Sequence, residues 1–107
     1  RPMLALYIGG MGAKGRNFYN DLARRYGYEK EAERIQDLYL AGRKDEAAAL
    51  VPRELLELTS LVGPEGLVRE RIAAMREAGV TVLNVTPMAN THAERVRLIE
   101  RVRELAS

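Results

Sequence analysis

The chain has no cysteine and no tryptophan, and only one histidine and four prolines among its 107 residues. Without cysteine, disulfides and thiolate metal sites are excluded, a composition that favours a cytoplasmic protein. No apolar run approaches the roughly 20 residues of a membrane span. The chain also lacks a large excess of one charge sign, because 17 basic and 15 acidic side chains leave a formal net charge of only +2. No basic cluster carries interleaved aromatic residues, so we expect neither nucleic acid nor membrane as a partner.

Two apolar segments have the length and composition of buried β-strands. Met3–Ile8 is a continuous apolar run that ends at Gly9, and Val80–Val85 is a β-branched run that stops before Pro87. Both are largely apolar without a clear alternation, which favours parallel strands covered on both faces. Periodicity leaves Ser60–Val62 open between a short strand and a helix end.

Helical periodicity and capping signals fill the rest of the chain. Asn17 has the side chain of an N-cap, and Thr91 with Glu94 fits a capping box. The expected helices cover residues 18–26, 29–41, 46–50, 52–58, 64–78 and 92–105. The inner face of the last helix is expected to carry Val96, Ile99 and Val102. Strands separated by helices imply parallel pairing, so we expect an α/β fold in a single segment, residues 1–107.

A sheet of two or three parallel strands is incomplete by itself. Its two edges would be open, and the helices of this chain could cover only one of its faces. The rest of a barrel, or a second copy that pairs through the exposed strand edges, is therefore the expected partner. The chain also begins with Arg1 and not with methionine, which suggests a cut product of a longer protein.

A glycine-rich loop follows the first apolar segment. Gly10–Gly15 fits the pattern G-x-G-x-x-G, which binds dinucleotide phosphates in a Rossmann fold. No second strand ending in an acid follows, so two other interpretations compete: a flexible loop, or a loop close to an anionic ligand. Lys14, Arg16 and the N-terminus of the next helix would add positive potential for such a ligand. His92 is expected at the surface, and no catalytic triad, zinc site or paired-carboxylate site is visible.

Motifs that carry a family resemblance extend along nearly the whole chain. They are Tyr7–Gly12, Asn17–Tyr19, Arg25–Tyr28, Ile35–Gly42, Asp45–Ala49, Val51–Pro52, Leu61–Pro64 and Ala78–Pro87. Together they resemble the luciferase-like flavin and deazaflavin oxidoreductases, in particular the actinobacterial branch that uses coenzyme F-420. The joined pattern is fairly specific to that branch, whereas each piece alone is weak.

The resemblance implies a fold and a reaction. The family fold is a TIM-type (β/α) barrel, and this chain would be its C-terminal segment, with Met3–Ile8, Ser60–Val62 and Val80–Val85 as parallel strands six to eight. The reaction would be hydride transfer between a small-molecule substrate and F-420 or, alternatively, FMN. Because the family places its acid and base groups on earlier strands, no catalytic residue can be assigned, and the chain alone would be inactive.

The resemblance also implies where the cofactor would bind, because barrel active sites lie at the carboxyl ends of the strands. The residues expected to contact the cofactor are Ile8, Gly9, Gly10, Met11, Gly63, Thr86 and Pro87. Two other functions stay open beside that of an oxidoreductase fragment. One is a non-enzymatic α/β module that self-associates, and the other is a Rossmann-like nucleotide binder that uses the loop at 10–15.

Overall fold

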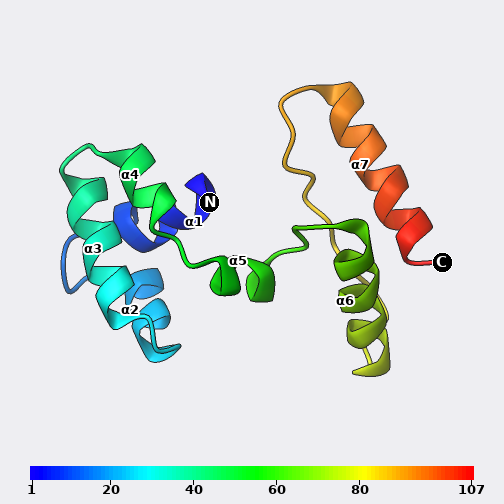
Figure 1. Ribbon diagram of the computed structural model, residues 1–107, viewed down its shortest axis with the longest axis horizontal. Coiled ribbons are helices and arrows are strands. Elements are labelled where there is room, and N and C mark those ends of the chain that lie inside the picture. The colour runs from blue at the N-terminus through cyan, green and yellow to red at the C-terminus, as the bar shows by residue number, and fades with distance from the viewer. The chain divides into compact units, whose positions relative to one another are not determined.

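A computed structural model describes all residues, Arg1–Ser107, and it contains helices but no β-strand. The chain forms two compact units, Arg1–Ser60 and Leu61–Ser107, which we describe separately. The helices of the first unit (Figure 1) are α1 (Pro2–Ala5), the π-helical turn η1 (Leu6–Gly10), α2 (Phe18–Arg25), α3 (Glu29–Leu40), α4 (Lys44–Ala49) and α5 (Arg53–Thr59). Those of the second unit are α6 (Glu65–Glu77) and α7 (His92–Leu105).

The predicted α/β fold, a parallel-stranded segment of a TIM-type barrel, is wrong for this structure. Met3–Ile8 lies in α1 and η1, while Ser60–Val62 and Val80–Val85 are not helical but have no strand partner. Periodicity alone cannot decide whether a short apolar run forms a helix or a buried strand. A helix pairs most of its own backbone, whereas a strand needs a neighbour, and the carbonyls of Tyr7 and Ile8 at the end of this helical run accept hydrogen bonds from side-chain amides.

The core of the first unit gathers around α3. The apolar face of α3 is buried, with Ala32, Ile35 and Leu38 at helical spacing and each at most 4% exposed. It packs against η1, α2 and α4. The other buried members of this core are Ala5, Ile8, Ala23, Ala47, Val51 and Leu55. Alanine at many of these contacts lets the short helices approach one another closely, and the first unit therefore has a continuous apolar interior.

The boundaries of the helices follow the capping signals closely. The side chain of Asn17 caps α2 by accepting from the backbone N–H of Asn20. Thr91 and Glu94 form both hydrogen bonds of the predicted capping box at the start of α7. Gly27 follows the end of α2 with a φ of 96°, a left-handed conformation that glycine adopts at low cost.

The second unit has a small core between α6 and α7, formed by Val68, Ile72 and Leu105. The predicted inner face of α7 is wrong at Val96 and Ile99, which are 38% and 49% exposed. Only the last turns of α7 therefore contribute to burial. At the surface, the Arg101 guanidinium on α7 forms an ion pair with the Glu65 carboxylate on α6. None of the helices in the structure is both long enough and apolar enough to cross a bilayer.

Candidate functional site

Two buried asparagines hold the C-terminal end of η1. The side-chain amide of Asn17 donates to the carbonyls of Tyr7 and Ile8, both at 3.0 Å. The amide of Asn20 donates to the same Ile8 carbonyl at 3.0 Å and to the Ala32 carbonyl at 2.8 Å. Carbonyls at a helix end have no intrahelical partner, so these amides replace the missing donors. They also join η1, α2 and α3 into one polar centre inside an apolar core.

Asn17 and Asn20 owe their position to local geometry. Residues at i and i+3 lie on the same side of a helix start, so the N-cap and third residue of α2 face η1 together. Their side chains are only 1% and 3% exposed. The remaining oxygen of Asn20 accepts from the Arg24 guanidinium Nε at 2.8 Å. Every polar atom of the Asn20 amide group is thus close to a partner, as burial requires.

The glycines next to this centre are required by close packing. A Cβ atom on Gly9 would lie 2.5 Å from the Cβ atom of Tyr39 and 3.1 Å from the Ile35 carbonyl oxygen. A Cβ atom on Gly10 would collide with the ring of Tyr39, and one on Gly12 with the backbone of Arg16. These glycines therefore let η1 and the loop approach α3 and the chain beyond the loop.

The basic residues of the glycine-rich loop are not all available to an anion. The ammonium group of Lys14 forms an ion pair with the carboxylate of Asp37 on α3. The side-chain amide of Gln36 donates to the Gly12 carbonyl at 3.4 Å, a long contact that draws the loop toward α3. No strand precedes the loop, so the strand–turn–helix context of a dinucleotide-binding turn is missing from this structure.

A small apolar groove lies on the first unit. Its volume is about 190 Å³, and its lining residues are Leu4, Tyr7, Ile8, Tyr19, Leu22, Ala23, Tyr26, Leu55 and Thr59. The rings of Tyr7 and Tyr19 meet with centroids 4.7 Å apart, tilted by 54°. The Thr59 hydroxyl donates to the Leu55 carbonyl at 2.7 Å. Pockets for cofactor-sized ligands usually measure about 300–1,000 Å³, so this groove is too small for one.

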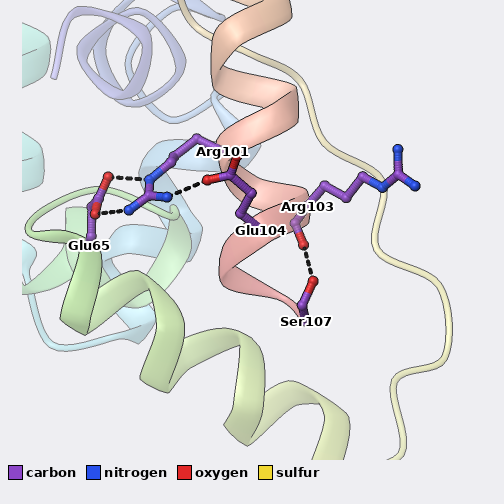
Figure 2. Close-up of polar contacts among 5 residues, drawn as sticks. All are labelled: Glu65, Arg101, Arg103, Glu104 and Ser107. Atoms are coloured by element: carbon purple, nitrogen blue, oxygen red, sulfur yellow. Dashed lines mark hydrogen bonds and ion pairs between the residues drawn. The ribbon is translucent and has the colours of Figure 1, made fainter.

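The second unit has a surface depression beside α7, lined by Ala89, Glu94, Arg97, Leu98 and Arg101. Its volume is about 490 Å³, but its lining side chains are mostly exposed. Figure 2 shows that the Arg101 guanidinium contacts the carboxylates of Glu65 and Glu104. The hydrogen bond from Arg101 lowers the pKa of Glu65, and the hydrogen bonds to Glu65 and Glu104 raise the pKa of Arg101. Arg101 is therefore already neutralised by protein carboxylates.

The seven residues predicted to contact a cofactor fall in both units. In the first unit, Ile8 and Gly9 are buried, Gly10 is half-buried and Met11 is 48% exposed. In the second unit, Gly63 and Thr86 are exposed and Pro87 is half-buried. Neither unit alone contains the whole set, and the assignment stays a prediction.

Sequence reasoning missed the internal role of Asn20 and Tyr39. The sequence motifs do not single out Asn20, yet its amide is buried in the core. A usable signal was present, because two amide residues at i and i+3 follow the glycine-rich loop, and the apolar segment before that loop ends in carbonyls that need donors. The close approach of Tyr39 to Gly9 and Gly10 could not be seen without the fold.

Comparison with known proteins identifies the family. Residues 1–82 match the family described as luciferase-like monooxygenase. A relative from Mycobacterium tuberculosis is 44% identical over 97 residues, which are 91% of this chain and 27% of the relative. No solved structure matches the chain.

The chain therefore belongs to the luciferase-like monooxygenase family, which confirms the resemblance seen in its motifs. The relative from Mycobacterium tuberculosis is named a putative coenzyme F-420-dependent oxidoreductase. The chain spans 27% of the length of that protein.

Proposed function

We propose that this chain is part of a luciferase-like oxidoreductase that transfers hydride between a small-molecule substrate and coenzyme F-420. The observation that carries the proposal is the 44% identity to a relative named for that cofactor, together with the family match over residues 1–82. FMN is the alternative cofactor, since the family resemblance includes flavin enzymes. When bound, such a cofactor supplies the hydride chemistry, and the protein supplies binding and orientation.

The residues of this chain do not by themselves fit a deazaflavin. The groove on the first unit is too small, with a volume of about 190 Å³. The carbonyl of Ile8 already accepts from two amides, and Gly9 and Gly10 face Tyr39 at contact distance. We therefore derive no catalytic step through the cofactor from these residues.

This misfit supports a second part of the proposal, that the chain alone binds the cofactor weakly and does not turn over. Of the predicted cofactor residues, Met11, Gly63 and Thr86 are exposed and could meet a ligand without unpacking the core. A tight site would need further polypeptide to enclose the cofactor. The partners proposed are accordingly the cofactor, a small-molecule substrate and additional protein surface. This structure has no strand edge for pairing, so the additional protein would contact exposed apolar side chains of this chain.

The test is a fluorescence titration of two proteins with F-420 and with FMN. One is the 107-residue chain, and the other is the Mycobacterium tuberculosis relative with its matching segment replaced by this chain. We expect the chimera to bind F-420 more tightly than FMN and to oxidise the reduced cofactor in the presence of a substrate panel. The chain alone should bind weakly and show no turnover.

Two results would count against the proposal. Tighter binding of FMN than of F-420 by the chimera would mean that the cofactor is a flavin and not a deazaflavin. Turnover by the 107-residue chain itself would refute the claim that the site needs further polypeptide. A Met11→Ala chimera tests the predicted contact, with Met88→Ala as the matched control, because Met88 is also exposed but is not a predicted cofactor residue.

A further inference from the structure

A position occupied by glycine can lack a side chain for three physical reasons. A glycine beside a ligand leaves open space at its Cα atom, because the ligand approaches the backbone there. A glycine in a tight turn adopts a positive φ. A glycine that serves packing shows neither feature, because protein atoms fill the space that a Cβ atom would take. These criteria can be applied to each glycine of the segment 9–15.

Three of the four glycines in this segment meet the packing criterion. Gly9, Gly10 and Gly12 do not have a positive φ. A Cβ atom on each would meet protein atoms, which belong to Tyr39 for the first two and to the backbone beyond the loop for the third. Gly15 alone faces open space, and its φ of 76° already requires glycine. The need for each glycine is therefore explained without a ligand.

Gly9 and Gly10 contact different parts of Tyr39. The three protein atoms nearest to a Cβ atom on Gly10 belong to the aromatic ring, with Cδ1 at 2.9 Å and Cζ at 3.1 Å behind an overlap with Cε1. A Cβ atom on Gly9 would instead lie 2.5 Å from the Cβ atom of Tyr39 and 3.1 Å from the Ile35 carbonyl oxygen. The Lys44 ammonium lies 5.5 Å from the ring centroid, an attraction that helps to hold the ring beside Gly10.

We infer that Gly9, Gly10 and Gly12 are a packing motif, which admits Tyr39 and the chain beyond the loop, and that none of these glycines contacts the cofactor. The inference rests on the proposed function only where it names F-420 as the ligand. It leaves Met11 as the exposed member of the predicted cofactor residues in the first unit. It also argues against a phosphate-binding role for these glycines, because a phosphate group would have to displace protein atoms.

The packing role is tested with a double-mutant cycle on the 107-residue chain, in which urea unfolding is followed by circular dichroism. Gly10→Ala should raise the unfolding equilibrium constant about tenfold or more, because the added methyl group overlaps the ring. In the Tyr39→Ala background the same substitution should be nearly neutral, since the ring is absent. Gly9→Ala is the matched control, and its cost should persist in that background because Tyr39→Ala keeps the Cβ atom.

The exclusion from the cofactor site is tested in the chimera of the Mycobacterium tuberculosis relative by fluorescence titration with F-420. The titration compares the variant Tyr39→Ala with the double variant Tyr39→Ala/Gly10→Ala, because both leave room for the added methyl group. Circular dichroism checks that both variants fold. We expect their dissociation constants for F-420 to agree within about twofold.

Equal costs of Gly10→Ala with and without the Tyr39 ring would overturn the packing role. F-420 binding that is weaker by about fivefold or more in the double variant would overturn the exclusion of Gly10 from the cofactor site. A wild-type chimera that binds no F-420 would count against the proposed function instead, and the double-mutant cycle would then decide the inference alone.

Discussion

Replacing Asn20 by alanine should strongly destabilise the first unit. The side chain makes two donor contacts, to the carbonyls of Ile8 and Ala32 at 3.0 and 2.8 Å, and it accepts one hydrogen bond from Arg24 at 2.8 Å. A protein hydrogen bond contributes roughly 1 kcal/mol net, so losing three costs about 3 kcal/mol. That is a large part of the roughly 5–15 kcal/mol that stabilises a typical domain.

The measurement is urea unfolding followed by tyrosine fluorescence. All five tyrosines lie in the first unit and the chain has no tryptophan, so the signal reports on that unit. The matched control is Glu33→Ala, because Glu33 lies in the same unit on α3, is exposed, and takes part in none of the described hydrogen bonds or ion pairs. We expect the control to change the free energy of unfolding by less than about 0.5 kcal/mol. Equal effects of the two substitutions would refute the role assigned to the buried amide.

Three further outcomes are expected. Gly9→Ala should lower the unfolding free energy by about 1–3 kcal/mol in the same urea assay, because its Cβ atom would overlap Tyr39; an unchanged midpoint would contradict that packing. Thr91→Ala should lower stability by about 1 kcal/mol and fray the start of α7, seen as faster amide hydrogen exchange there, whereas protected amides would argue against the cap. The contact with Arg101 lowers the pKa of Glu65, so its stabilising effect is present above the unfolded pKa of about 4.3 and is lost as the pH falls through the lower folded value. Carbon NMR of the Glu65 carboxyl should show this lowered pKa, and Arg101→Gln should return it toward the ordinary value; a normal pKa in the wild type would contradict the contact.

The helix boundaries could be predicted because their causes are local. An N-cap such as Asn17 or a capping box such as Thr91 with Glu94 acts within one turn, so sequence spacing alone reveals it. The apolar face of α3 could also be predicted from its 3.6-residue period. These signals require no knowledge of what the helix packs against.

The predicted strands were wrong because their formation depends on partners distant in sequence. Met3–Ile8 is apolar on all sides, a pattern that fits a buried helix as well as a buried strand. The carbonyls of Tyr7 and Ile8 find donors on Asn17 and Asn20, about ten residues away, which stabilises the helical form. The glycine-rich loop could be recognised from the sequence alone. Its packing on Tyr39 could not be predicted, because that contact joins residues distant in sequence.

The family followed from the joined motifs, since a pattern spread over nearly the whole chain is more specific than any single motif. The location of the cofactor residues stays a prediction, because it was taken from the family's barrel, which this structure does not contain. Ile8 and Gly9 are buried, whereas Met11 is 48% exposed.

The conformation of Met3–Gly10 decides most directly whether this account is right. If these residues are helical, the Ile8 carbonyl is held by two amides, and the groove on the first unit is too small for a deazaflavin. Backbone NMR chemical shifts of the 107-residue chain measure this conformation residue by residue. We predict helical Cα and carbonyl shifts throughout the segment, with short amide–amide contacts between neighbours. Extended-strand shifts at these residues would contradict the fold described and the reasoning built on it.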